Sequence, residues 1–122
     1  MKKFSVAIGF ITLLIIVGGV YFLSKSNPPK NYPLPQNLEY FWGNGCPHCA
    51  NVEQFLNTWD KKDKIKIDKK EVWQNATNAT EMQARYEYCK IPATEMRVPL
   101  LFTPEGKCFS GDTPIIDYLK SL

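Results

Sequence analysis

The sequence predicts an α/β fold, and three observations support this prediction. Between residues 38 and 122, short apolar or alternating runs typical of strands are separated by longer runs whose apolar residues recur every three or four positions, as in helices. The order of the elements is strand, helix, strand, helix, strand, strand, helix. A length of 122 residues leaves room for one domain. Together these features predict a central four-stranded mixed sheet flanked by helices.

The first half of the domain is expected to alternate strand and helix. Residues 38–42 form an apolar run that predicts the first strand, and a helix is expected from about residue 46 to residue 59. The second strand is expected around residues 65–70, where isoleucines alternate with lysines. The lysine run there indicates an exposed edge of the sheet. The apolar stripe of the helix consists of Val52, Phe55, Leu56 and Trp59.

The second half is expected to begin with a helix and a hairpin. A helix capped by Asn75 or Asn78 should stop before Pro92, because proline cannot continue a helix. Residues 98–102 are almost continuously apolar and predict a buried strand. After a turn, residues 107–110 return beside that strand. The apolar stripe of this second helix consists of Ala79, Met82, Tyr86 and Cys89.

A third helix is expected at the end of the domain. Thr113 is expected to cap it, and Pro114 suits the first helical position, where a missing N–H is tolerated. Its buried face is expected to consist of Ile115, Ile116, Leu119 and Leu122.

The first two dozen residues differ in character from the rest. Residues 4–23 are an unbroken stretch without charge. At about 1.5 Å per residue, a helix of roughly twenty residues spans about 30 Å, the thickness of a hydrocarbon core. The stretch therefore predicts one N-terminal transmembrane helix in a lipid bilayer, within an anchor or uncleaved signal over residues 1–24. A cleavable signal has a shorter apolar region, and residues 24–26 offer only a weak cleavage site.

A proline-rich linker over residues 25–37 is expected to separate this segment from a domain over residues 38–122. The flanking lysines predict a single-pass topology with the N-terminus in the cytoplasm and the domain extracytoplasmic, in the periplasm or at the cell surface. Four cysteines in a small domain agree with that location, because disulfides are rare in the cytosol. All twelve acidic residues lie beyond residue 30, together with most of the basic ones, so the +3 net charge gives no indication of nucleic-acid binding.

The most informative motif is Cys46-Pro47-His48-Cys49. It follows the strand at residues 38–42 and a turn, and it opens the first predicted helix. Two thiols three residues apart can close a disulfide within one helical turn. The succession of strand, turn, Cys-x-x-Cys and helix predicts redox chemistry.

Each residue of this motif has an expected role. Cys46 is expected to be the nucleophile, because unpaired N–H groups and the positive end of the dipole at a helix start lower a thiol pKa from about 8.5. Pro47 fits the first turn because its missing N–H removes a donor that has no partner within the helix. His48 is expected to stabilise the thiolate further and to make the disulfide more oxidising. Cys49, one turn later, is expected to resolve the mixed disulfide.

Metal binding is the competing interpretation of this motif. Zinc needs four ligands, and the motif offers three donors too closely spaced to bind one ion without distortion. Cys89 and Cys108 form no second Cys-x-x-Cys pair. Haem attachment requires a histidine directly after the second cysteine, and that position is an alanine. We therefore expect no metal and no bound cofactor.

Cys89 and Cys108 leave three interpretations open. A structural disulfide would close a loop of about twenty residues and contribute about 3 kcal/mol in the chain-entropy model. Alternatively, the two residues are unpaired core cysteines, or they form a second redox-active pair.

These residues resemble the thioredoxin superfamily across residues 38–122. The Cys-Pro-His-Cys tetrapeptide is typical of DsbA-type oxidases, and the element order and the ending from Val98-Pro99 through Gly111-Asp112 resemble compact glutaredoxin-like members. The resemblance implies a thioredoxin-like fold in which Pro99 is cis and shields Cys46 from metal. It also implies that the Val98 backbone pairs with a bound substrate strand. Trp42 flanks the active turn, where it could contact substrate or belong to the core.

Two departures from the resemblance bear on mechanism. Thioredoxins carry a buried acid six residues before the first active cysteine, where this chain has Tyr40, so proton transfer at Cys49 is expected to use water or the neighbouring Glu39. In addition, Cys49 and Pro99 are too close in sequence for the large helical insertion of DsbA, which would otherwise form a peptide-binding groove.

The sequence therefore predicts a membrane-anchored extracytoplasmic thiol-disulfide oxidoreductase that acts on protein thiols and disulfides, oxidase rather than reductase. A membrane redox partner would reset its disulfide. The alternative is a redox-inactive thioredoxin-like adaptor that holds peptides, or a metal-binding module.

Overall fold

The computed structural model describes residues 1–23 and 32–122, apart from the side chains of residues 2–5 and 22–23. The chain divides into two compact units, Met1–Lys30 and Asn31–Leu122. The first unit contains helix α1 (Lys2–Leu23). Among the described residues, no helix is long and apolar enough to cross a membrane, and the expectation of a transmembrane helix over residues 4–23 is therefore not supported.

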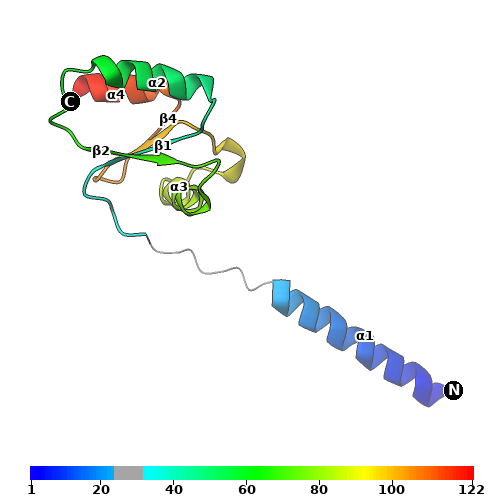
Figure 1. Cartoon of the computed structure of the whole chain (residues 1–122). Coiled ribbons are helices and arrows are strands. Elements are labelled where there is room, and N and C mark those ends of the chain that lie inside the picture. The colour runs from blue at the N-terminus through cyan, green and yellow to red at the C-terminus, as the bar shows by residue number, and fades with distance from the viewer. Residues whose placement is uncertain (24–31) are drawn as a thin grey trace. The chain divides into compact units, whose positions relative to one another are not determined.

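The second unit is built on a four-stranded sheet with the order β2-β1-β3-β4 (Figure 1). Strand β1 (Leu38–Trp42) pairs in parallel with β2 (Ile67–Glu71) and antiparallel with β3 (Leu100–Phe102). Strand β4 (Cys108–Ser110) pairs antiparallel with β3. The predicted α/β fold with a mixed four-stranded sheet is confirmed, and so is the place of the lysine-rich strand β2 at an edge.

Helices cover both faces of this sheet. Figure 1 shows α2 (Pro47–Thr58) and α4 (Asp112–Ser121) side by side on one face and α3 (Ala76–Tyr88) on the other. A short 3₁₀ helix, η1 (Ala93–Glu95), precedes β3 and was not predicted.

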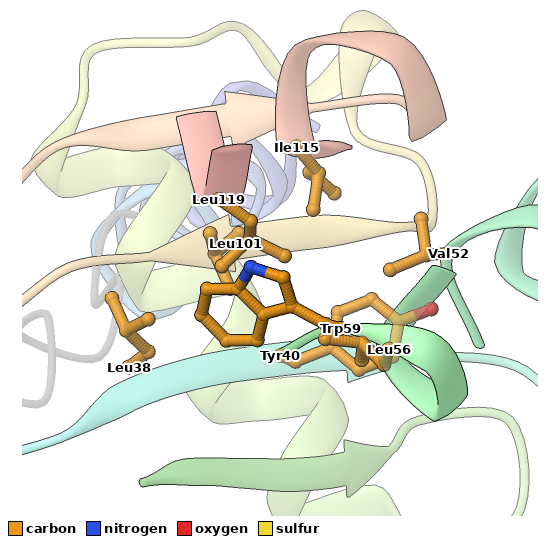
Figure 2. Packing of buried hydrophobic residues seen from close by; sticks show 8 residues of the cluster. All are labelled: Leu38, Tyr40, Val52, Leu56, Trp59, Leu101, Ile115 and Leu119. Carbon is orange, nitrogen blue, oxygen red and sulfur yellow. The ribbon is translucent and has the colours of Figure 1, made fainter. Parts of the chain in front are cut away.

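Two hydrophobic clusters follow from the alternation of side chains along the strands. The α2 and α4 face buries eight residues, and Figure 2 shows them with the Trp59 indole near the middle. Each fully buried apolar side chain contributes about 1.5–3 kcal/mol relative to exposure. The members are Leu38, Tyr40, Val52, Leu56, Trp59, Leu101, Ile115 and Leu119; the α3 face buries Phe41, Val72, Tyr86, Leu100 and Phe102.

The terminal helix begins earlier than expected. Its N-cap is Gly111, with φ 94° and ψ 159°, and Thr113 lies inside the helix instead of capping it. The Asp112 Oδ1 atom accepts the Thr113 N–H at 3.0 Å, which gives the first turn a side-chain acceptor without a threonine cap. The buried face is also shorter than expected, because Leu122 is 41% exposed at the end of the helix.

The predicted linker over residues 25–37 lies partly outside the described residues, as far as residue 31. Its described end contacts the domain. The Tyr32 carbonyl accepts a hydrogen bond from Arg85 Nη1 at 3.4 Å, and Asn37 Nδ2 donates to Asp68 Oδ2 at 3.1 Å. The described end of the predicted linker thus contacts α3 and β2, and the bounds of the linker stay a prediction.

Candidate active site

Cys46 stands at the N-cap of α2, where its extended backbone precedes the first helical turn. The Cys49 N–H donates to Cys46 Sγ at 3.1 Å, and Pro47 occupies the first helical position. A sulfur in this position receives an unpaired N–H and the positive end of the helix dipole, both of which stabilise a thiolate. The environment expected for Cys46 from the sequence is thus present.

The two cysteines of the motif form a disulfide, with 5.2 Å between their Cα atoms. Cys46 is 7% exposed and Cys49 is 2% exposed. Cys46 is therefore the more accessible of the two residues, and its role as nucleophile and that of Cys49 as resolving cysteine stay predictions.

A hollow of about 510 Å³ lies beside the disulfide. The Trp42 side chain at the end of β1 forms part of its wall, and the same residue packs against the α2 and α4 cluster. Trp42 thus packs against the core, which is one of the two roles that the sequence left open, and its contact with substrate stays a prediction. The lining residues are Trp42, Gly43, Gly45, Cys46, Pro47, Cys49, Ala50, Glu53, Gln54 and Asn57.

His48 is exposed and points to the first turn of α4. Its Nδ1 atom lies 3.1 Å from Asp112 Oδ2, and Asn51 Nδ2 donates to the same oxygen at 2.7 Å. Hydrogen bonds from Asn51 and His48 lower the pKa of Asp112 to about 2. The ionised Asp112 carboxylate can only accept hydrogen bonds, so Nδ1–H of the His48 ring donates to it. The roles of Asp112 and Asn51 were not predicted from the sequence, although Asn51 follows His48 by three positions on one helical face.

Val98 and Pro99 lie where β3 begins, and the peptide bond between them is cis. Because Phe41 pairs with Leu100 in an antiparallel register, Pro99 belongs to the same end of the sheet as Trp42. The Pro99 carbonyl accepts the Gly111 N–H at 2.9 Å, one residue before Asp112. The backbone thus links Pro99 to the turn that contacts His48. The substrate-binding roles of Val98 and Pro99 stay predictions.

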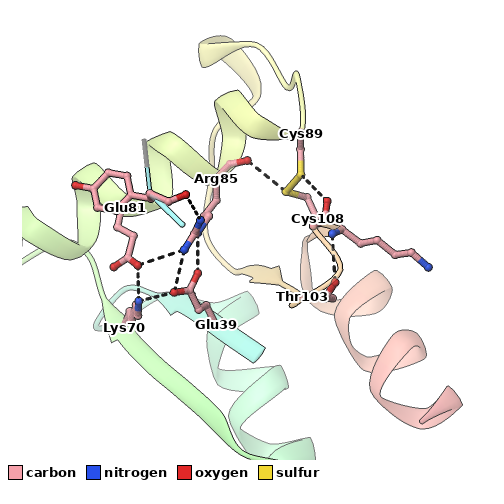
Figure 3. A network of polar contacts seen from close by, with 10 residues as sticks. Glu39, Lys70, Glu81, Arg85, Cys89, Thr103 and Cys108 are labelled. Carbon is pink, nitrogen blue, oxygen red and sulfur yellow. Dashed lines mark hydrogen bonds and ion pairs between the residues drawn. A yellow bond between two sulfur atoms is a disulfide. The ribbon is translucent and has the colours of Figure 1, made fainter. Parts of the chain in front are cut away.

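Glu39 is turned away from the active cysteines. Its carboxylate accepts hydrogen bonds from Arg85 Nε at 2.8 Å and from Lys70 Nζ at 2.7 Å, and Lys70 also contacts Glu81 at 2.7 Å (Figure 3). All four side chains lie on the α3 side of the sheet, whereas Cys49 lies on the α2 side. The expectation that Glu39 exchanges a proton with Cys49 is therefore wrong. Successive side chains of a strand point to opposite faces of the sheet, and Glu39 points to the face that is opposite to Cys49.

Tyr40 occupies the opposite face of β1. Its hydroxyl donates to the Cys49 carbonyl at 3.2 Å. Burial, with a smaller contribution from the Glu53 carboxylate, raises the pKa of the Tyr40 phenol. The hydroxyl therefore stays protonated at neutral pH and fixes the first turn of α2 to the sheet.

Cys89 and Cys108 form a second disulfide, which joins the end of α3 to β4 with 6.3 Å between the Cα atoms. Figure 3 shows this disulfide next to the Glu39, Lys70, Glu81 and Arg85 cluster. Because Cys89 and Cys108 are paired, the interpretation of these residues as unpaired core cysteines is wrong. Across residues 1–23 and 32–122, no group of three or more histidine, cysteine, aspartate or glutamate side chains is arranged to hold a metal ion.

A comparison with protein families matches residues 38–103 to the glutaredoxin family, over more than half of the chain. The chain belongs to the glutaredoxin family. The match runs from the first residue of β1 through β3, and it includes the Cys46–Cys49 pair and Pro99. A search among curated proteins finds no match to the chain. The domain is therefore a glutaredoxin-like thiol-disulfide oxidoreductase, with a redox-active Cys-x-x-Cys disulfide and thioredoxin-like architecture.

Proposed function

We propose that this protein donates disulfides to protein thiols outside the cytoplasm, through a Cys-Pro-His-Cys active site. The observation that carries the proposal is the position of Cys46 Sγ, which accepts the Cys49 N–H at the N-cap of α2. Stabilising the Cys46 thiolate favours the reduced form of the pair, and a pair with a stabilised reduced form is the more oxidising one.

In this proposal a substrate thiolate attacks Cys46 Sγ, which is the more exposed of the two residues. A bond forms between the substrate sulfur and Cys46, the Cys46–Cys49 bond breaks, and Cys49 leaves as a thiolate that takes up a proton. A second substrate thiolate then attacks the substrate sulfur and releases Cys46. The substrate is oxidised by two electrons and the active pair is reduced. A redox partner that accepts these electrons resets the disulfide.

Substrate is proposed to bind at the end of the sheet that carries Trp42, Val98 and Pro99. Trp42 borders the hollow beside the cysteines, and the cis Val98–Pro99 bond lies at the same end of the sheet. An extended segment of a client protein would place its cysteine there, with the Val98 backbone as a pairing partner.

The extracytoplasmic location is supported by the second disulfide. Cys89 and Cys108 are paired away from the active motif, and structural disulfides persist in oxidising compartments and are rare in the cytosol. Labelling of intact cells with a thiol reagent that cannot cross membranes, after mild reduction, tests this location. Labelling of Cys46 without lysis is expected; labelling only after lysis would contradict it.

The decisive experiment is the reduction potential of the Cys46–Cys49 pair, measured by equilibration with glutathione buffers. A value near about −120 mV supports the disulfide donor, and a value near about −270 mV identifies a reductase instead. An active pair that never exchanges with glutathione would favour the redox-inactive peptide-binding adaptor.

His48→Leu tests the tuning role of the histidine. Without the imidazole the thiolate is less stabilised, so the potential is expected to become more negative by about 30 mV or more, equivalent to about 1.4 kcal/mol. An unchanged potential would mean that the N-terminus of α2 alone tunes the pair.

A further inference from the structure

Cys49 has to exchange a proton although it is almost inaccessible. It is 2% exposed, and in the disulfide exchange proposed above it alternates between a thiolate and a thiol. A buried thiol loses its proton reluctantly, because burial disfavours the charged form. The reaction therefore needs a group that connects Cys49 to solvent.

Two neighbouring groups are unsuitable for this role. Glu39 lies on the other face of the sheet, where Arg85 and Lys70 occupy its carboxylate. The Tyr40 hydroxyl already donates to the Cys49 carbonyl, and its pKa is raised, so it holds its proton at neutral pH.

Glu53 is the acidic side chain that meets the requirement. It follows Cys49 by four positions on α2, which places both on one face of the helix. Glu53 and both active cysteines line the same hollow. Its Oε2 atom lies 2.7 Å from Lys69 Nζ, and the Glu53 side chain is 31% exposed. Lys69 is the neighbour of Tyr40 across the β1 and β2 pair, so the ammonium holds the carboxylate over the α2 face of the sheet.

We infer that Glu53, held by Lys69, relays the proton of Cys49 through water in the hollow. The inference rests on the proposed function and adds a positioning residue to its active site. When Cys49 resolves a mixed disulfide, its proton passes through water to the Glu53 carboxylate. Cys49 Sγ then bonds to Cys46 Sγ, the bond from Cys46 to the substrate sulfur breaks, and the substrate leaves as a thiolate. In the opposite direction, Glu53 returns the proton to Cys49. The titratable groups that face Glu53 are Lys69 from β2, Tyr40 from β1, and the two cysteines of α2.

The test uses the full chain with the active pair reduced and the Cys89–Cys108 disulfide verified as closed by mass spectrometry. Reaction with excess 2,2′-dipyridyl disulfide releases one equivalent of thiopyridone when Cys46 attacks and a second when Cys49 resolves. The second phase is intramolecular and independent of reagent concentration, and Cys49→Ser should abolish it. Both phases are followed from mildly acidic to alkaline pH.

Glu53→Gln is expected to slow the second phase by roughly 10–100-fold at mildly acidic pH, with a much smaller effect on the first phase. The difference in second-phase rate between Glu53→Gln and the unmodified protein should shrink as the pH rises, because Cys49 then ionises without help. Glu53→Asp should recover part of the second-phase rate. Lys69→Met, which keeps the Glu53 carboxylate, should slow the second phase far less than Glu53→Gln does. The matched control Glu87→Gln alters an exposed acid on α3 and should leave both phases unchanged.

Three results would overturn the relay. An unchanged second phase in Glu53→Gln excludes it. A faster second phase means that Glu53 acts only as a nearby negative charge, whose removal favours the Cys49 thiolate. Slowing of the second phase by Glu53→Gln to the same extent at every pH means that the Glu53–Lys69 pair matters only for structure. Absence of the first phase in the unmodified protein would instead contradict the proposed function itself.

Discussion

At the scale of single residues, the partner of a side chain decides its role. Glu39 and Tyr40 are adjacent in sequence, yet one belongs to a buried ionic cluster and the other to the hydrophobic core under the active helix. Arg85 is 3% exposed, which is rare for arginine unless it is paired. The Glu39 carboxylate contacts both Arg85 and Lys70 and therefore compensates two charges that have little access to water.

Glu39→Gln is expected to destabilise the domain by about 3 kcal/mol, because it removes the carboxylate that contacts the buried Arg85 guanidinium most closely and leaves only Glu81 Oε1, 3.6 Å from Arg85 Nη2, as its counter-charge. Denaturant unfolding at neutral pH measures this difference. Glu87→Gln, at an exposed position of α3, is the matched control and should change the free energy of unfolding by about 0.5 kcal/mol or less. A similar effect of both variants would show that the cluster does not contribute to stability.

The contribution of Glu39 is expected to disappear in acid. Burial by itself raises the pKa of this carboxyl, but hydrogen bonds from Arg85 and Lys70 outweigh burial and hold the pKa below its ordinary value. Its stabilising contribution is therefore fully present above the unfolded-state pKa of about 4.3 and is lost as the pH falls through the lower folded-state pKa. The stability gap between the unmodified protein and Glu39→Gln should accordingly narrow on acidification below about pH 4. A constant gap at all pH values would contradict the lowered pKa.

At the scale of elements, the start of α4 connects the fold to the active site. Gly111 caps the helix with φ 94° and ψ 159°, a conformation that essentially only glycine adopts without strain. Its N–H donates to Pro99, and the next residue, Asp112, contacts His48. One backbone turn thus joins the cis proline, the last helix and the active-site histidine.

Gly111→Ala is expected to cost about 1–3 kcal/mol of stability, because alanine at this φ and ψ is strained. Thr113→Ala should cost less than about 0.5 kcal/mol, because the threonine is exposed and lies inside the helix. Urea unfolding of the two variants compares them directly. If Thr113→Ala lowers the free energy of unfolding by about 1 kcal/mol and Gly111→Ala does not lower it, then Thr113 caps the helix, as predicted from the sequence.

At the scale of the whole molecule, two long-range connections define the compact unit. The segment before β1 contacts α3 and β2 through Tyr32 and Asn37, and the Cys89–Cys108 disulfide ties α3 to β4. Neither connection belongs to the active site. Both are expected to act on stability without changing the chemistry of Cys46 and Cys49.

A fragment of residues 32–122 is expected to be more stable than a fragment of residues 38–122 by about 1–2 kcal/mol. The shorter fragment lacks the Tyr32 carbonyl and the Asn37 amide and leaves Arg85 Nη1 without that acceptor. Denaturant unfolding of both fragments measures the difference, and Asn37→Ala in the longer one isolates the contact with Asp68. If the two fragments are equally stable, the domain begins at Leu38, the first residue of β1, as expected from the sequence.

Replacing both Cys89 and Cys108 by alanine is expected to lower the free energy of unfolding by about 3 kcal/mol, because the loop they close gains entropy in the unfolded chain. The reduction potential of the Cys46–Cys49 pair should be the same before and after the replacement. A shifted potential would instead support the third interpretation of these cysteines, a second redox-active pair.

Features that depend on neighbouring residues could be predicted from the sequence. Cys46-Pro47-His48-Cys49 and its place at the start of a helix follow from spacing and from helix-start preferences, and the structure has Cys46 as the N-cap of α2. Asn75 was one of two expected caps, and it is the cap of α3. The cap of α4 was mistaken because threonine before proline is a strong local signal, whereas the Gly111 conformation depends on its contact with Pro99.

The order of the elements, the redox motif and the apolar faces of the helices can be read from the sequence, because each of these depends on residues within a few positions of one another. Three further features appear only in the folded chain: Asp112 contacts His48, Glu39 pairs with Arg85 and Lys70, and Glu53 shares a hollow with Cys49. The Asp112 and Glu39 partnerships join residues tens of positions apart. Glu53 and Cys49 are neighbours on α2, but the hollow that they share is bounded by Trp42 at the end of β1. The packing of the helices on the sheet therefore creates both partnerships and the hollow.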